Sequence, residues 1–323
     1  MKPKEILVFG ATGQIGRHLL RKLAKKNFKL TVVTRNLHRK AYILKSQANA
    51  GWLNIIELDS FNYEKLKQIF KNKDICINLI GILNQKSKNS FYNIHTLLPQ
   101  KLAELSKENN LEQFIHISAL GIENALQSKY ALSKISGEDE IKKIFKKYVI
   151  LRPSLVYSVD DKFTTMLFKM LKLFPIFPLY YKGKTIFYPI HVTDMCEIIE
   201  KVILNESNEE IIECIGPEEI SFKEIIKRLL KSLDIKRLLV PTPLFIAKIF
   251  ANFFEMTMKN PLLTKDQLIL LNYNNSPSGK YKTNVELKLN TNLKYFDNEI
   301  LKYSYAWKTG GEFSKKKKII NLF

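Results

Sequence analysis

The chain has 323 residues, 46% of them hydrophobic, which is enough for one large domain or two small ones with a substantial core. Its three cysteines, Cys76, Cys196 and Cys214, have no CxxC spacing, which excludes a zinc ribbon, argues against disulfides and predicts no metal site. The formal net charge of +21 comes from lysines spread along the whole chain without a nucleic-acid-binding motif, so we predict solvated surface and no specific nucleic-acid partner.

The first predicted elements are a strand, a glycine turn and a helix. An apolar run at 6–9 precedes the glycine turn, and apolar residues at helical spacing follow it. We expect Gly10 to make the tight turn, Gly13 to admit a pyrophosphate and Gly16 to allow close helix packing. The helix start would receive the phosphates. The predicted cofactor-binding residues are Gly10, Thr12, Gly13, Gln14, Ile15 and Gly16. The alternative is a glycine turn that only packs a helix onto a sheet.

The first half of the chain alternates strands and helices, as a doubly wound parallel sheet does. Further strands are predicted at 29–34, 55–58, 74–80, 114–118 and 148–152, and helices at about 63–70, 96–109 and 130–145. Pro153 ends the last of these strands because it has no N–H to donate. The pattern predicts an α/β Rossmann fold.

Cofactor choice is predicted from the end of the second strand. An acidic residue there would bind the ribose 2′-hydroxyl of NAD, but this chain has Arg35, with Arg39 one turn further on. A guanidinium binds phosphate in a bidentate manner, so NADP(H) is favoured over NAD(H). The alternative is a solvated basic turn. Asp59, just past the third strand, is placed to accept a bond from the adenine amino group or to cap the following helix.

A second motif lies after the fifth predicted strand. Tyr130 and Lys134 are four residues apart and share one helix face. A nearby ammonium favours the phenolate and lowers the tyrosine pKa, which makes an acid or base for use near neutral pH. The alternative is a tyrosine on a basic surface helix.

The regular alternation of strands and helices ends after residue 153. An extended piece is predicted at 188–192, a helix at 193–204 and a last strand at 211–215, and Ser221 with Glu224 forms a capping box for another helix. We predict a Rossmann domain at 1–155, to which 185–216 returns. The remainder, 156–184 and 217–323, forms a small, mostly helical substrate- or partner-binding region. His191 is expected to be a packed or capping residue.

Two apolar segments, 163–181 and 244–254, lie in this second region. Lysines and prolines interrupt the first, so it is a poor membrane-spanning candidate. Core or binding-site lining is expected for both, and peripheral attachment to an anionic bilayer, helped by the basic tail at 315–318, is the alternative. The chain enters its first strand directly after Met-Lys-Pro-Lys, which predicts no signal or transit peptide. We expect a cytoplasmic protein, with peripheral association at the inner membrane as the alternative.

In combination these motifs resemble the short-chain dehydrogenase/reductase superfamily, in its extended and atypical, NAD(P)-dependent epimerase/dehydratase-like branches. The matching segments are 10–16, 114–118, Tyr130 with Lys134, 151–157 and 191–194, in order. Within the superfamily the chain is most similar to the NADPH-binding accessory subunit family of respiratory complex I and its bacterial relatives. That closer similarity lies in 77–81, 114–118, 174–179, 240–244 and 263–267.

The resemblance implies roles for several residues. In active members Tyr130 would be the acid or base, Lys134 would bind the nicotinamide ribose, and a serine after strand five would hold the substrate oxygen. Here Ala119 stands where that serine is expected, and Ser118 is the substitute, which argues against hydride chemistry. Gly81 and Pro153, at the ends of two strands, complete the predicted cofactor-binding residues.

Three functions follow from the resemblance. We favour an accessory protein whose NADP(H) is structural or regulatory, linked to the respiratory chain or ubiquinone metabolism, with complex I or ubiquinone-related proteins as partners. The second is an active NADP-dependent reductase or epimerase that uses Tyr130 and Lys134 on a hydrophobic or quinone-related substrate. The third is a redox-sensing regulator. Whether the chain is an enzyme stays open at this point.

Overall fold

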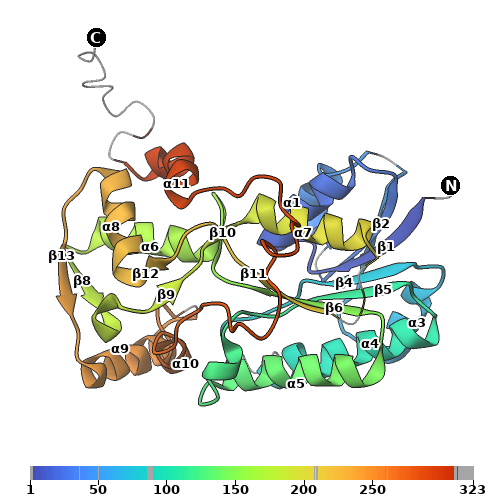
Figure 1. Cartoon of the computed structure of the whole chain (residues 1–323), viewed down its shortest axis with the longest axis horizontal. Helices are drawn as coiled ribbons and strands as arrows, with labels where there is room; N and C mark the ends of the chain where they lie inside the picture. The colour runs from blue at the N-terminus through green and yellow to red at the C-terminus, as the bar shows by residue number, and fades with distance from the viewer. Residues whose placement is uncertain are drawn as a thin grey trace, which may run out of the picture. The chain divides into compact units, whose positions relative to one another are not determined.

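The computed structural model describes residues 3–35, 37–49, 51–85, 90–206, 208, 210–259, 261–308 and 311, without the side chains of 39–41. The Arg39 side chain and the basic tail at 315–318 therefore lie outside the described residues. Two compact units make up the chain (Figure 1). Unit 1 comprises the described residues within 1–154, 192–215 and 275–292, and unit 2 those within 155–191, 216–274 and 293–323.

Unit 1 is built on a seven-stranded parallel sheet in the order β11-β6-β5-β4-β1-β2-β3. Its strands are β1 Lys4–Phe9, β2 Phe28–Thr34, β3 Leu53–Glu57, β4 Ile75–Asn78, β5 Gln113–Ile117, β6 Tyr148–Pro153 and β11 Glu210–Cys214. The order of strands reverses between β1 and β4, and ligands of such sheets bind beside the carboxyl ends of the strands at this point. The predicted Rossmann α/β fold is confirmed.

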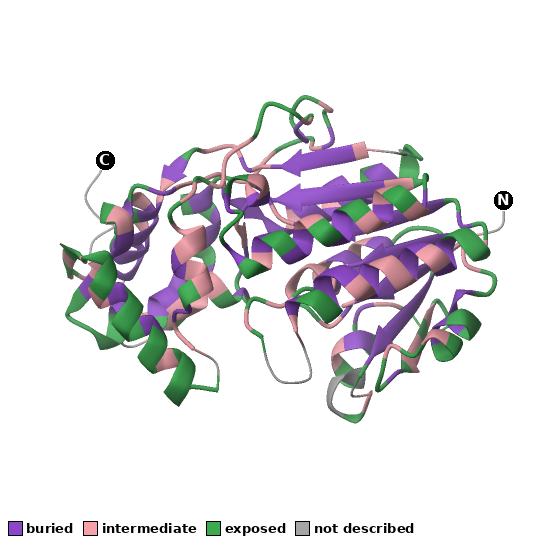
Figure 2. Cartoon of the chain, turned by 90° about the horizontal axis from the view of Figure 1, so that it is seen from below, coloured by how far each residue is buried: buried purple, intermediate pink, exposed green. Residues whose placement is uncertain are grey.

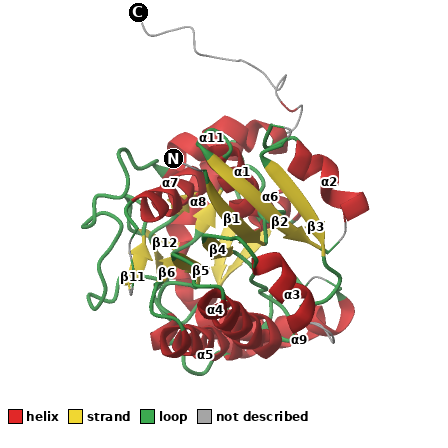
Figure 3. Cartoon of the chain, turned by 90° about the vertical axis from the view of Figure 1, so that its right-hand side faces the viewer, coloured by secondary structure: helices red, strands yellow, loops and turns green. Residues whose placement is uncertain are grey.

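Helices cover both faces of this sheet (Figure 3). They are α1 Gln14–Leu23, α2 Leu37–Lys45, α3 Tyr63–Phe70, α4 Leu98–Glu108, α5 Lys129–Ile144 and α7 Val192–Leu204, with a π-helical turn η1 at Tyr92–Leu97 and a 3₁₀ turn η2 at Ile122–Asn124. Helices α1 and α7 pack together on one face, and α3, α4 and α5 on the other. The strands between them are largely buried (Figure 2), as the near-continuous apolar runs of a doubly covered parallel sheet require.

Unit 2 is mostly helical and contains short paired strands. Its helices are α6 Lys162–Leu173, α8 Phe222–Leu233, α9 Leu244–Thr257, α10 Lys265–Leu270 and α11 Phe296–Ser304, with 3₁₀ turns η3 Tyr180–Gly183 and η4 Tyr305–Trp307. Its strands are β7 Val156–Tyr157, β8 Ile176–Leu179, β9 Ile186–Phe187, β10 Ile190–His191, β12 Ile220–Ser221 and β13 Leu238–Pro241. They pair as β10-β7, β12-β9 and β13-β8. Across the described ranges, no helix is both long and apolar enough to cross a membrane.

The two units divide the chain differently from the predicted domains in two places. Residues 185–191, expected to return to the Rossmann domain, lie in unit 2, because β9 and β10 pair with β12 and β7 of that unit. Residues 275–292, expected in the second region, lie in unit 1. Ser278 binds Glu213 there, and the Asn284 amide donates to the carbonyl of Ile215. The sequence of 275–292 has no strand or helix pattern from which its place in unit 1 could be predicted.

Candidate nucleotide-binding site

The glycine turn between β1 and α1 has the compact geometry that its three glycines permit. Gly10 has φ +82°, a conformation that L side chains rarely adopt, and its carbonyl accepts a hydrogen bond of 2.9 Å from the Gly13 N–H. A Cβ at Gly16 would lie 2.5 Å from the Gly10 oxygen, so only glycine lets α1 start this close to the strand. A Cβ at Gly13 would meet only the Gly10 carbonyl, at 3.2 Å, so Gly13 leaves space on its other sides.

The amino end of α1 is suited to an anion. The helix is capped by Gly13, it carries no acidic residue in its first turn, and Arg17 stands one turn in. The Arg17 guanidinium donates to the Thr12 carbonyl at 3.2 Å, which keeps a cation beside the turn. The positive end of the helix dipole acts in the same direction.

The ends of β2 and β3 carry the residues expected to select the cofactor. The Thr34 hydroxyl is buried and has no hydrogen-bond partner among the described residues, whereas Arg35 is exposed. Glu57, beside Thr34 in the sheet, accepts from the Leu37 N–H at 2.9 Å and is therefore engaged at the start of α2. The Glu57 carboxylate, next to Thr34 in the sheet, thus already accepts a backbone hydrogen bond.

Asp59 is more exposed than the sequence implied. Its side chain is 77% exposed and pairs with Lys65 at 3.2 Å, and this hydrogen bond lowers the pKa of the carboxyl. The alternative prediction that Asp59 caps the next helix is wrong. Asn62 does so, accepting from the Glu64 N–H at 3.0 Å, because it is the residue immediately before α3.

Helix α5 presents the tyrosine and lysine of the YxxxK motif. Ser128 caps it, accepting from the Ala131 N–H at 3.2 Å. Tyr130 is half-buried, but Lys134 is only 3% exposed, and its ammonium donates to the Ile117 carbonyl at the end of β5 at 2.9 Å. Burial lowers the pKa of Lys134 to about 8, against a smaller raising effect of Glu138. The lysine is therefore a cation whose charge is held at the carboxyl edge of the sheet.

A buried histidine that sequence reasoning missed lies beside this pair. His95, on the π-helical turn η1, accepts from the Ile82 N–H through Nε2 at 3.1 Å, so the proton of the neutral ring is on Nδ1. Nδ1–H then donates to the Ser133 hydroxyl at 2.9 Å, and Ser133 donates to the Tyr130 carbonyl at 2.7 Å. The His95 ring also packs edge to face on Tyr130, with centroids 5.2 Å apart. This chain of contacts links the loop after β4 to the tyrosine.

Two features allow His95 to reach this position. A Cβ at Gly137 of α5 would lie 1.8 Å from the His95 carbonyl oxygen, so glycine is required for the helix and the turn to touch. π-Helical turns are rare and are frequent at functional sites. The available sequence signal was spacing, since His95, Leu98, Leu102 and Leu105 share one helix face and all four are buried.

A second buried histidine, His116, lies on β5. The Asn78 Oδ1 accepts from the Ile80 N–H at 3.1 Å, so its amide nitrogen faces Nδ1 of His116 at 3.1 Å. The neutral His116 therefore carries its proton on Nε2. This atom and the Ser118 hydroxyl are both buried without a hydrogen-bond partner among the described residues. Two unused polar groups thus lie along the end of β5.

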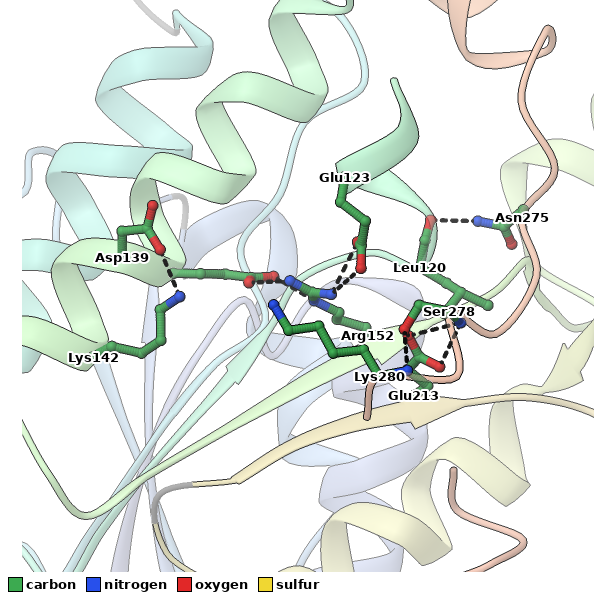
Figure 4. Close-up of polar contacts among 10 residues, drawn as sticks. Leu120, Glu123, Asp139, Lys142, Arg152, Glu213, Asn275, Ser278 and Lys280 are labelled. Carbon is green, nitrogen blue, oxygen red and sulfur yellow. Dashed lines mark hydrogen bonds and ion pairs between the residues drawn. The ribbon is translucent and has the colours of Figure 1, made fainter. Parts of the chain in front are cut away.

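A buried arginine fixes the strand beside this edge (Figure 4). Arg152 on β6 forms a bidentate pair with Glu138, at 3.0 and 2.7 Å, and binds both oxygens of Glu123 at 2.9 Å. Burial alone would lower the pKa of Arg152, but the Glu138 hydrogen bonds and the two carboxylate charges raise it. The guanidinium also lies 4.8 Å from the centroid of Tyr281. Pro153, the next residue, is buried, and its carbonyl accepts from the Leu120 N–H at 2.9 Å.

The arrangement fits a dinucleotide. A Cβ at Gly81 would lie 3.6 Å from the Lys134 ammonium and 3.9 Å from Nε2 of His95, so the glycine keeps the approach to both groups clear. The loop at Gly81, Tyr130 and Lys134 are thus brought together, and the Gly10 turn touches the end of β4 at Leu79. The nicotinamide ring of such a cofactor would supply hydride-transfer chemistry when bound. No cluster of metal-binding side chains occurs among the described residues.

His191 lies elsewhere, in unit 2. Its ring packs on Tyr157 with centroids 5.2 Å apart, and Nε2 lies 3.9 Å from the Glu299 carboxylate. It is 8% exposed. These contacts are those of a packed histidine, as the sequence predicted.

Comparison with known proteins agrees with this geometry. Residues 6–214 match the model of the NAD dependent epimerase/dehydratase family. In solved structures, the fold resembles dTDP-glucose 4,6-dehydratase DesIV from Streptomyces venezuelae with NAD and TYD bound, with a TM-score of 0.67 at 16% identity over 94% of this chain and 96% of the other. The protein belongs to the NAD dependent epimerase/dehydratase family.

Two named proteins are similar to this chain in sequence. The mitochondrial NADH dehydrogenase [ubiquinone] 1 alpha subcomplex subunit 9 of Mus musculus is 27% identical over 81% of this chain and 70% of its own length. A ceramide reductase of Caulobacter vibrioides is 25% identical over 58% of this chain and 57% of its own length. The predicted resemblance to the complex I accessory subunits is confirmed at the level of sequence.

The two buried histidines predict a loss of stability in acid. Burial holds the pKa of His95 at about 2 and that of His116 well below its usual value of 6.5, with the charge of Lys134 adding to both shifts. Both rings are neutral in the folded chain but take up protons near pH 6.5 when unfolded. Their contribution to the free energy of unfolding is therefore present above pH 6.5 and lost below it. The free energy of unfolding should fall by about 3 kcal/mol in total between about pH 7.5 and 5.5.

Urea unfolding at the two pH values measures this loss. His95→Asn should remove about half of it, while His38→Asn, a change at an exposed histidine, should leave it unaltered. If His95→Asn kept the full pH dependence, His95 would not be the buried neutral group described above.

Proposed function

We propose that this protein is an NADP(H)-binding accessory protein of a respiratory complex, associated peripherally with the inner membrane, in which the nucleotide is a structural or regulatory ligand. The observation that carries the proposal is that the nucleotide-binding turn is present while the expected catalytic serine is not. The glycine turn is intact, but Ala119 replaces the expected serine, and the Ser118 hydroxyl is buried. The similarity to a mouse subunit of NADH dehydrogenase [ubiquinone] supports the choice of partner and the link to ubiquinone.

The preference for NADP(H) is part of this proposal. Arg35 is exposed at the end of β2, Arg17 stands in the first turn of α1, and the nearby Glu57 carboxylate is engaged by the Leu37 N–H. A 2′-phosphate beside Arg35 would gain a charge-assisted hydrogen bond. Electrostatics at the adenosine end thus favour the phosphorylated cofactor.

Thermal unfolding with each cofactor tests the preference. At a concentration about 100 times its dissociation constant, NADPH should raise the melting temperature by roughly 5 °C, and NADH at the same concentration by clearly less. Arg35→Asp should remove the difference because a carboxylate repels the 2′-phosphate. Lys45→Asp, the same charge change on an exposed residue of α2, is the control. Equal shifts with NADH and NADPH in the unaltered protein would contradict the preference.

The respiratory partner can be tested by capture. The full chain, tagged and purified from gently solubilised membranes of its own source, should recover subunits of NADH dehydrogenase. A tagged chain with Gly16→Val, whose side chain would collide with the Gly10 carbonyl, should recover less if the nucleotide-bound fold is what the complex recognises. Recovery of the unaltered protein alone, wholly from the soluble fraction, would count against this function.

An active reductase is the second candidate, and specific residues favour it. Tyr130 and Lys134 are present on one face of α5. Burial lowers the pKa of Lys134 to about 8, which still lies above neutral pH, so most of the positive charge remains. The Caulobacter relative, named a ceramide reductase, gives a precedent for a lipid-like substrate. Tyr130 would be the acid or base, and Ser118 would have to turn toward the substrate.

Loss of NADPH absorbance with added quinones or long-chain ketones tests this second function. If the protein is active, Tyr130→Phe should lower the rate by about 10²–10⁴-fold, because the phenol proton is lost while the ring contact with His95 stays. Tyr42→Phe, at an exposed tyrosine, is the matched control. Turnover that survives Tyr130→Phe would remove the tyrosine from the chemistry, and no turnover in the unaltered protein favours the accessory role.

A further inference from the structure

Helix α9 of unit 2 has its apolar side facing outward. Ala247 and Ala251 are fully buried against the rest of the unit. The opposite side consists of Phe245, Ile249, Phe253 and Met256, whose side chains are 66%, 64%, 59% and 80% exposed. These four residues follow one stripe, because their spacings of four, four and three match the helix period. A surface helix of a globular protein normally carries polar residues on that side.

Exposed apolar residues also occur in the strand that leads into the helix and in the strand paired with it. Strand β13 leads into α9 and pairs in register with β8, where Leu238 lies opposite Ile176, and these two are 62% and 52% exposed. Leu173 and Phe174, just before β8, are 73% and 44% exposed. We call this set the outer apolar surface: Leu173, Phe174, Ile176, Leu238, Phe245, Ile249, Phe253 and Met256. Figure 1 shows β8 beside β13, and β13 leading into α9.

The sequence segments that carry these apolar residues are strongly basic. The two segments that contribute to it, 168–184 and 236–259, contain one acidic residue, Glu255. Their basic residues are Lys169, Lys172, Lys182, Lys184, Lys236, Arg237, Lys248 and Lys259. The chain as a whole has 52 basic and 31 acidic residues, so a ratio of eight to one is far above the general excess. An exposed apolar helix side in a strongly basic segment is complementary to an anionic lipid surface.

We propose that the outer apolar surface lies on an anionic bilayer, with α9 in the membrane plane. This names the surface for the peripheral association proposed above and rests on that part of the proposed function. At 14 residues α9 is about 21 Å long, shorter than the ~30 Å hydrocarbon core, and its alanine side stays packed on the protein. Its phenylalanines reach the boundary between headgroups and acyl chains, and the lysines bind lipid phosphates. A second copy is a poor occupant, since two such basic segments would repel each other.

Vesicle sedimentation with the full chain tests the surface. Vesicles of phosphatidylcholine with about 30% phosphatidylglycerol should bind the protein, and vesicles of pure phosphatidylcholine should bind it much more weakly. Ile249→Glu with Phe253→Glu should reduce binding at least tenfold. Leu301→Glu, at a 58% exposed leucine of α11, is the matched control and should bind as the unaltered protein does. Lys248→Glu should cost about fivefold or more, an effect that high salt removes.

A tryptophan at position 253 reports on depth. The fluorescence of Phe253→Trp should shift to the blue on anionic vesicles and be quenched by lipids labelled on the acyl chain, and that of Leu301→Trp should not. Binding that is unchanged by the paired glutamates would overturn the α9 surface while leaving the membrane association itself intact. No binding of the unaltered protein to either vesicle would overturn both. A concentration-dependent dimer in lipid-free buffer, abolished by the same glutamates, would assign the surface to a second copy.

The same variants separate this surface from the nucleotide site. Melting-temperature shifts with NADPH should be equal in the unaltered protein and in the paired glutamate variant, since the glycine turn lies in unit 1 and α9 in unit 2. Loss of the NADPH shift together with vesicle binding would show general misfolding and remove the support that the vesicle result gives.

Discussion

The carboxyl edge of the sheet depends on one buried cation with two carboxylates. Arg152 is 4% exposed and joins the end of β6 to α5 through Glu138 and to the turn after β5 through Glu123. Removing one partner of such a buried pair typically costs about 3–5 kcal/mol, because a charge is left in a poorly solvated position. Glu138 lies one turn beyond Lys134, so the interaction that stabilises the sheet edge also sets where the lysine stands. The site is therefore positioned by electrostatics within the protein before any ligand arrives.

Around that edge, the polar groups of the protein are arranged to be neutral or internally paired. The two buried histidines have defined tautomers, Lys134 is bound to the Ile117 carbonyl, and Glu57 is bound to the Leu37 N–H. In the proposed function, the cations that would bind the phosphates of a dinucleotide are Arg17 and Arg35. A site of this kind holds an anionic ligand well with few groups left to change charge during a reaction. This agrees with a bound nucleotide whose role is to stabilise or to report.

The fold could be predicted because the strands of the sheet contain short apolar runs that alternate with helical patterns. The glycines between β1 and α1 could be predicted because their spacing matches the steric needs of the turn. Three features could not. The spacing of His95 with Leu98 and Leu102 indicates a buried ring but not its contact with Tyr130, because that contact joins the π-helical turn to a separate helix, α5. Asp59 and Asn62 both suit a helix start, and only the backbone decides between them. The pattern of 244–254 shows an apolar helix but does not show which of its sides is buried. Core lining was therefore expected, whereas the small alanines are buried and the large side chains are exposed.

The return of residues 275–292 to unit 1 has a consequence for biosynthesis. Glu213 on β11 is fully buried, and its carboxylate accepts hydrogen bonds from Ser278, 65 residues later in the chain. Until the ribosome has made that segment, the edge strand of the sheet holds an uncompensated charge, which disfavours its burial. A chain that ends before residue 278 lacks this partner for Glu213, so β11 should join the sheet only after most of the chain has been made, although the glycine turn and the YxxxK motif are synthesised early.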